Sequence, residues 1–186
     1  MKITGRPNRF IIAIFLQVLI ILGIIVFKLT VLTGETVLLK VEPVDPRDWL
    51  RGDYATFRYN FSTIDSFMLE SEPVRNGDNL FVILKKSGKY WMAESAQKFK
   101  PLNENLVFIK GKVLSGGIEG QSEIFPDQPP PGSRLQIIYG IEQYFIPEGK
   151  GWDSTLWEKE PFAEVSIDGQ GNAVLKQLYV DGKPWP

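Results

Sequence analysis

The feature that most constrains this chain is an uncharged apolar run near its N-terminus. Residues 10–27 contain 18 residues and a single polar side chain, Gln17. As an α-helix rising about 1.5 Å per residue, the run spans roughly 27 Å, close to the hydrocarbon thickness of a bilayer. Isoleucine and leucine side chains lie on all faces of this helix, so it lacks the polar face of a helix that packs on a soluble core. We therefore expect one transmembrane helix over residues 10–32.

A cleaved signal peptide is the main alternative for this segment. Signal peptides have an apolar region of about 7 to 15 residues, followed by small residues at the cleavage site. Here the run is longer, and it ends Val26-Phe27-Lys28-Leu29 without such residues. The sequence therefore favours an anchor that is retained.

Basic residues around the run predict its orientation. The residues before it include three bases, Lys2, Arg6 and Arg9. After it, only Lys28 precedes Lys40. By the positive-inside rule, residues 1–9 should stay in the cytoplasm. We therefore expect a single-pass protein of the cytoplasmic membrane, with the lipid bilayer as a partner and residues 33–186 on the periplasmic or extracellular side.

The composition of the chain excludes several kinds of chemistry. Cysteine and histidine are both absent, which removes disulfides, thiolate nucleophiles, the commonest general base and the commonest transition-metal ligand. All 22 acidic residues follow residue 34, against 17 basic residues there. A mildly acidic domain without basic clusters is a poor nucleic-acid binder. We expect no catalytic residues, no cofactor, no metal site and no nucleic-acid partner.

After Gly34 the sequence changes to short alternating or β-branched apolar runs separated by Gly, Pro, Asn and Asp. This pattern is typical of antiparallel sheets. It predicts a mainly β fold, in which one β-rich domain forms a sandwich or partly open barrel with one or two short helices. The predicted strands are Thr36–Val44, Tyr54–Phe61, Asn79–Lys86, Tyr90–Ala96, Leu106–Val113, Leu135–Ile141, Phe162–Ile167 and Ala173–Val180.

Turn residues add local detail to this fold. Ser87-Gly88 and the segment 168–172 are each expected to close a hairpin. Gly111 lies inside a predicted strand and is expected to mark a bulge. Short helices are expected near residues 63–70 and 153–159.

A charged corner separates the first two predicted strands. Residues 41–59 read VEPVDPRDWLRGDYATFRY. The acids and bases of the corner alternate: Asp45, Arg47, Asp48, Arg51 and Asp53. Such a turn is either a salt-bridged scaffold or a docking surface or small-ligand site. In the strand after it, period-two alternation directs Phe57 and Tyr59 into the core.

This segment resembles the bacterial GDYxxLxY protein family. The matching positions are Gly52, Asp53, Tyr54 and Tyr59, with Phe57 at the family's leucine. A second block, residues 139–149, resembles another characteristic segment of the family and contains Tyr139, Glu142, Tyr144 and Glu148. The resemblance implies a membrane-anchored protein with no assigned activity, often associated with multi-span membrane proteins. It implies architecture and location more than chemistry.

Glu142 offers a way to join the two blocks. If its carboxylate faces inward, it should pair with a base such as Arg47 or Arg51, because an isolated buried carboxylate is costly. The two segments would then form one site.

The function that best fits these features is that of a non-enzymatic accessory or assembly protein. Its outer domain would dock to a membrane complex or envelope component, such as a multi-span protein. Exposed tryptophans are candidate interface anchors: Trp152, Trp157 and Trp185.

Two other functions stay open. A membrane-tethered hydrolase could resemble signal peptidase, but no serine stands in the residues before Gly52-Asp53; a carboxylate pair would use Asp53 with Glu142 or Glu148. A small-ligand sensor would instead use an aromatic pocket formed by Tyr54, Tyr59, Tyr139 and Tyr144.

Overall fold

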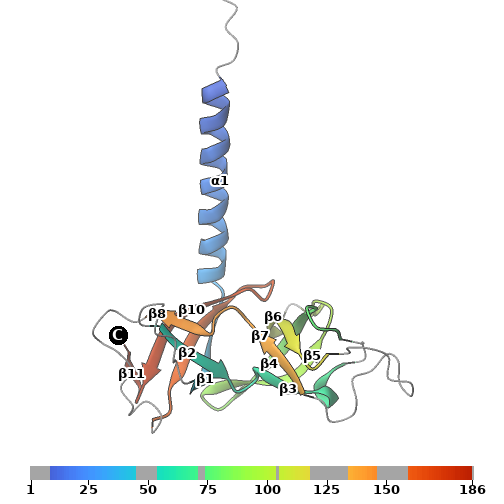
Figure 1. Cartoon of the computed structure of the whole chain (residues 1–186). Coiled ribbons are helices and arrows are strands. Elements are labelled where there is room, and N and C mark those ends of the chain that lie inside the picture. The colour runs from blue at the N-terminus through green and yellow to red at the C-terminus, as the bar shows by residue number, and fades with distance from the viewer. Residues whose placement is uncertain are drawn as a thin grey trace, which may run out of the picture.

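The computed structural model describes residues 9–44, 54–70, 74–103, 105–117, 134–145 and 159–185. One long helix, α1 (Arg9–Leu32), stands away from a β-rich domain (Figure 1). The strands are antiparallel and form two half-barrel sheets, so the predicted mainly β fold is confirmed.

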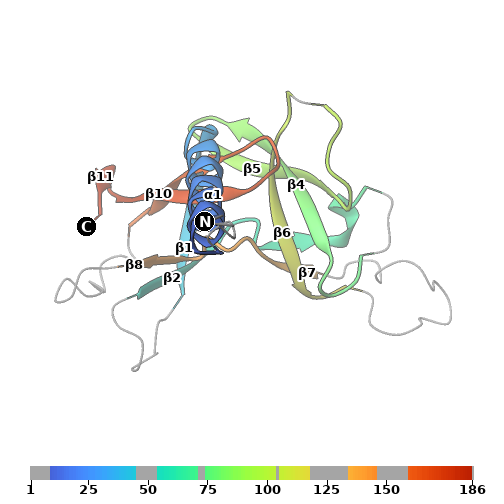
Figure 2. The ribbon, with the colours of Figure 1, turned by 90° about the horizontal axis from the view of Figure 1, so that it is seen from above.

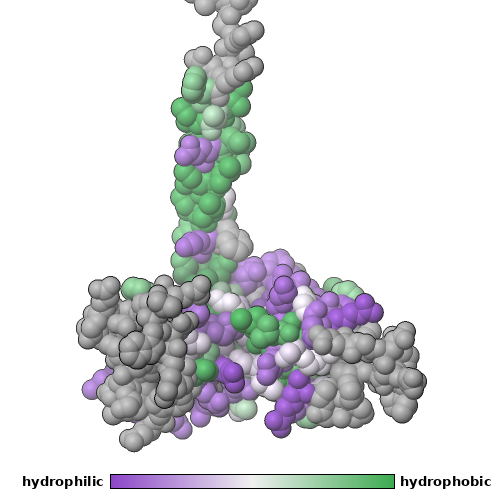
Figure 3. All heavy atoms as spheres, in the orientation of Figure 1, coloured by the Kyte–Doolittle hydropathy of each residue, from purple (hydrophilic) through white to green (hydrophobic). Residues whose placement is uncertain are grey.

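The predicted N-terminal helix is present, and its apolar side chains are largely exposed. Figure 3 shows hydrophobic atoms covering most of its surface. In the part of the chain that the structure describes, however, no helix qualifies as long and apolar enough to cross a membrane. The structure thus gives the helix but does not support its transmembrane character.

The end of α1 is fixed against the β domain. Val31 is 1% exposed, and the Ser166 hydroxyl donates a hydrogen bond to the Leu32 carbonyl at 3.2 Å. A Cβ atom at Gly34 would lie 2.1 Å from the carbonyl oxygen of Ile167, so only glycine permits this close approach. The helix therefore leaves the domain in a defined direction, above β1 and β10 in Figure 2.

The first sheet is formed by the two strands that follow α1 and by four strands from the C-terminal part of the chain. Its order is β11-β10-β9-β1-β2-β8. The bounds are β1 (Glu35–Val44), β2 (Tyr54–Tyr59), β8 (Gln143–Phe145), β9 (Phe162–Ile167), β10 (Ala173–Val180) and β11 (Lys183–Pro184). Alternate residues of β1, including Val37 and Leu39, are fully buried, which is the pattern of a strand with one face on the core.

The second sheet is built from the middle of the chain, in the order β3-β7-β6-β4-β5. The bounds are β3 (Thr63–Asp65), β4 (Asn79–Ser87), β5 (Tyr90–Gln97), β6 (Val107–Ser115) and β7 (Arg134–Ile138). Its buried residues, such as Leu80, Val82 and Ile109, belong to the same hydrophobic cluster as those of the first sheet. The two sheets therefore share one core.

All eight predicted strands are present, and β9 and β10 have the predicted bounds. Both predicted hairpins are confirmed. Ser87 pairs with Tyr90 across a turn in which Gly88 has φ +63°. In the other hairpin, the Asp168 carboxylate accepts the N–H groups of Gln170 and Asn172 at 2.9 and 2.8 Å.

The short helix expected near residues 63–70 is confirmed only in part. The segment begins as β3 and continues as one short 3-10 helix, η1 (Ser66–Met68). Ile64 is buried opposite Leu135 of β7, so strand pairing there overrides local helix propensity. The second expected helix, 153–159, lies outside the described residues except for Lys159.

Gly111 does not mark a bulge, because it pairs regularly with Leu80. Its role is steric. A Cβ atom at Gly111 would lie 2.4 Å from Cγ2 of Ile137 and 2.8 Å from the ring of Tyr139. Glycine therefore provides the space in which the Tyr139 ring packs.

Candidate functional site

The two segments that resemble the family lie side by side in the structure. Strand β2 pairs with β8, with Thr56 opposite Gln143. The N–H of Phe57 donates to the carbonyl of Glu142 at 3.0 Å. The backbone thus joins the first block to the second, as expected for a single structural unit.

Tyr59 and Tyr139 form the centre of this unit. They are 2% and 8% exposed. The Tyr59 hydroxyl donates to the Ile141 carbonyl at 2.7 Å, and the Tyr139 hydroxyl donates to the Phe61 carbonyl at 2.8 Å. Both rings also pack on Phe61, with centroids 5.6 and 5.1 Å away. These two tyrosines are therefore core residues and do not line the predicted ligand pocket.

Burial changes the acidity of both tyrosines. Desolvation raises the pKa of the Tyr59 hydroxyl and that of Tyr139 well above the usual range for tyrosine, and the nearby Glu142 carboxylate raises them further. Both hydroxyls therefore keep their protons, and their hydrogen bonds, at neutral pH.

These shifts make the stability of the domain sensitive to alkali. Because the folded-state pKa values lie above the unfolded value of about 10, the unfolded chain loses these protons first as the pH rises. The stabilisation is complete below about pH 10, and above it the free energy of unfolding should fall by up to about 1.4 kcal/mol per pH unit for each tyrosine.

The measurement is urea unfolding of the full chain in detergent at several pH values from about 8 to 11, beside a Tyr59→Phe, Tyr139→Phe variant. The variant should lose about 1 kcal/mol per hydrogen bond at pH 8 but decline less steeply above pH 10. Equal slopes for both proteins would contradict the assignment to these tyrosines.

Glu142 has a local role. Its half-buried carboxylate accepts the N–H of Tyr139, which closes a turn where Gly140 has φ +80°. The predicted pairing of Glu142 with Arg47 or Arg51 lies outside the described residues. The observed bond positions the second block next to β2.

Tyr144 of β8 packs against the C-terminal end of the chain. Its ring centroid lies 6.2 Å from that of Trp185, and the side-chain amide of Gln177 donates to the Trp185 carbonyl at 2.7 Å. Trp185 is partly buried and packs against the core, which favours a core-covering role over that of an exposed anchor. These contacts hold the C-terminal segment against β10.

Much of the predicted site lies outside the described residues. This is true of Asp45, Arg47, Asp48, Arg51, Gly52, Asp53 and Glu148, and also of Trp152 and Trp157. Tyr54 is described as a backbone position of β2, opposite Phe145.

A groove of about 210 Å³ lies where β2 passes close to β7, and we name it the seam groove. Its lining residues are Val44, Thr56, Phe57, Arg58, Ser62, Thr63, Leu114, Gln136, Ile137, Ile138 and Glu142. Figure 3 shows a patch of hydrophobic atoms near the middle of this face of the domain. The lining of the groove therefore comes mainly from β2, which belongs to the first family-like block, and from β6 and β7 of the second sheet.

The seam groove has the chemistry of a recognition surface. Leu114 and Ile138 are 63% and 45% exposed, and both line the groove, so two large apolar side chains face solvent there. Arg58 is exposed beside them and lies opposite the exposed Glu42 of β1, and no salt bridge joins Arg58 to a described carboxylate. An apolar patch next to an exposed guanidinium suits a ligand with an apolar group and a carboxylate.

Sequence reasoning missed Leu114 and Ile138, although a signal was present. Each follows a buried apolar residue, Val113 or Ile137, at a position where alternation favours a polar outward side chain. Two such pairs on neighbouring strands indicate an exposed apolar patch.

Among the described residues, no group of three or more acidic, histidine or cysteine residues is arranged to hold a metal ion.

Comparisons with known proteins give one match. The family model described as GDYXXLXY protein matches residues 17–178, which is most of the chain. Neither the curated proteins nor the solved structures contain a match.

Proposed function

The chain belongs to the GDYXXLXY family, and from this premise we propose that it is a membrane-anchored accessory protein whose β domain binds a partner protein through the seam groove. The family name describes a sequence motif and no reaction. The proposal therefore rests on the groove and on the N-terminal helix.

The anchoring part rests on the sequence of α1. Residues 10–27 carry no charge, and the described apolar side chains of the helix are exposed except for that of Val31. Such a surface is stabilised in an apolar phase. The bases before the helix favour a cytoplasmic N-terminus and a β domain outside the cytoplasmic membrane.

The docking part rests on the exposed apolar patch beside Arg58. The fixed end of α1 holds the β domain close to the membrane, and the seam groove lies on a side of the domain (Figure 3). A partner in the same membrane could reach that side. Charge complementarity favours an occupant that has a carboxylate next to an apolar side chain. We propose that this occupant is an outer segment of a membrane protein, and that the partner is a multi-span protein.

The other candidate functions have less support. The Glu142 carboxylate already accepts a backbone N–H, which weakens its case as half of a catalytic pair. Tyr59 and Tyr139 direct their hydroxyls to backbone carbonyls, which weakens the case for a tyrosine-lined sensor pocket. These observations favour docking over a hydrolase or a small-ligand sensor.

The proposal is tested by purifying the full chain in mild detergent and identifying bound proteins by mass spectrometry. The test variant, Arg58→Glu with Ile138→Asp, reverses the charge and removes the apolar contact. We expect it to recover at least about tenfold less partner, since loss of a central contact costs more than about 1.4 kcal/mol.

The matched control is Lys183→Glu with Leu102→Asp, which makes the same kinds of change at exposed positions outside the groove. Thermal unfolding checks that both variants fold. A folded groove variant that retains its partner at the parental level would refute docking at the seam groove. A parent that recovers no partner would refute the accessory function.

A further inference from the structure

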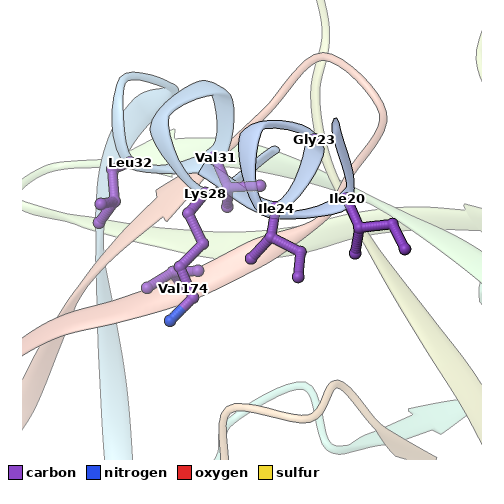
Figure 4. Close-up of a pocket in the computed structure, with 7 residues that line it drawn as sticks. All are labelled: Ile20, Gly23, Ile24, Lys28, Val31, Leu32 and Val174. Carbon is purple, nitrogen blue, oxygen red and sulfur yellow. The ribbon is translucent and has the colours of Figure 1, made fainter. Parts of the chain in front are cut away.

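A second groove lies where α1 meets the first sheet, and we name it the anchor groove. It has a volume of about 480 Å³ and is lined by Ile20, Gly23, Ile24, Lys28, Val31, Leu32 and Val174. In Figure 4 the side chains of Ile20, Ile24 and Lys28 point to the same side of the helix. Their spacing of four residues explains this common face.

The anchor groove is apolar except at the end nearest the β domain. Lys28 is its one charged lining residue, and it is exposed. Figure 4 shows the Lys28 side chain extending beside Val174 of β10. Ile20 lies eight residues away, or about 12 Å along the helix. The groove thus offers a cation at one end and an apolar channel along the anchor.

Gly23 makes room in the middle of this channel. Apart from its chain neighbours and the nearby backbone of the helix itself, no described atom lies within 4 Å of the position that a Cβ would occupy there. A ligand can therefore approach the helix backbone at this point, as small residues permit in membrane helices. The volume of the groove is within the range of about 300–1,000 Å³ that holds small ligands.

We propose that the anchor groove binds one phospholipid, with the phosphate at Lys28 and an acyl chain along Ile24 and Ile20. This inference rests on the proposed membrane anchoring. A lysine at the membrane boundary extends its ammonium group toward the headgroup region, where phosphate is the anion within its reach. The ammonium and the phosphate then form a charge-assisted hydrogen bond.

A partner helix fits this groove less well. The lining includes Val174 of β10, so the β domain closes the lower end of the groove. A helix running along α1 would meet β10 at that end, whereas a phospholipid would place its headgroup there. The Lys28 ammonium group likewise complements a phosphate, whereas an apolar helix face would offer it no anion.

Native mass spectrometry of the full chain in detergent tests the site, with two probes that share the same acyl chains. Dioleoyl phosphatidylglycerol has the phosphate, and dioleoylglycerol lacks it. We expect the parent to bind the phospholipid about tenfold more tightly, which corresponds to one charge-assisted contact. Lys28→Gln should remove this difference, and Gly23→Leu should weaken the binding of both lipids.

The matched controls are Lys183→Gln and Ala13→Leu, which change a lysine and a small helix residue outside the groove; both should behave as the parent. Equal binding of the two lipids by the parent, or unchanged binding by Gly23→Leu, would overturn the site. If Gly23→Leu instead disrupts a dimer without affecting lipid, the groove holds a second helix and the inference is wrong.

Membrane fractionation of the same proteins separates this inference from the proposed function. A parent that remains with membranes but fails the lipid test overturns the lipid site alone. A parent found in the soluble fraction overturns the anchoring on which the site rests.

Discussion

Replacement of Gly111 by alanine is expected to destabilise the β domain by about 2–4 kcal/mol. The added Cβ would lie 2.4 Å from Cγ2 of Ile137 and 2.8 Å from the Tyr139 ring. That ring has little freedom to move, because its hydroxyl donates to the Phe61 carbonyl and the ring makes a T-shaped contact with the Phe61 ring. Overpacking costs about 1–3 kcal/mol, and the strained hydrogen bond adds about 1 kcal/mol.

The measurement is urea unfolding of the full chain in detergent, followed by tryptophan fluorescence. Against a total stability of about 5–15 kcal/mol for an ordinary domain, the loss should shift the midpoint clearly. Gly169→Ala is the matched control, because no described atom outside its two chain neighbours lies within 4 Å of its Cβ position and its φ is not positive. An unchanged midpoint for Gly111→Ala would contradict the packing of Tyr139 against this glycine.

Gly111 also shows the limit of local sequence patterns. A glycine inside a strand indicates either a bulge or a close approach, and the neighbouring residues do not separate the two. The ring that requires the space belongs to Tyr139, on a segment that reaches β6 only through the fold of the second sheet. The glycine was noticed from the sequence, but its partner was not.

Strand prediction succeeded where strands were long and alternating. β9 and β10 were predicted with their bounds because apolar alternation continues up to a turn with a clear Asp-Gly signal. The missed strands, β3, β8 and β11, have two or three residues each. Such short segments have no measurable periodicity, and pairing with a longer neighbour defines them.

The tyrosines illustrate the same limit for the candidate site. Alternation correctly directed Tyr59 into the core, but the sensor hypothesis assigned Tyr59 and Tyr139 to a polar pocket. Their hydroxyls donate to the backbone carbonyls of Ile141 and Phe61, which are 82 and 78 residues away in the sequence. A buried tyrosine needs such a partner, and only the fold shows which one it has.

Three lysines introduced into α1 are expected to release the protein from membranes. The variant is Leu16→Lys, Leu19→Lys and Leu22→Lys, at positions whose side chains are exposed on the helix. A lysine near the centre of a membrane helix costs about 2.5–3.5 kcal/mol, and each lost leucine removes a favourable contribution. The three changes together should cost roughly 9 kcal/mol, which is enough to abolish stable anchoring.

Alkaline carbonate extraction of membranes from cells that express the protein measures the effect. The parent should remain in the pellet, and the lysine variant should move almost completely to the supernatant. Alanine at the same three positions is the matched control and should stay in the pellet, because it shortens the side chains without adding charge. A parent that is itself extracted would contradict anchoring, and a lysine variant as resistant as the parent would show that α1 is not the anchor.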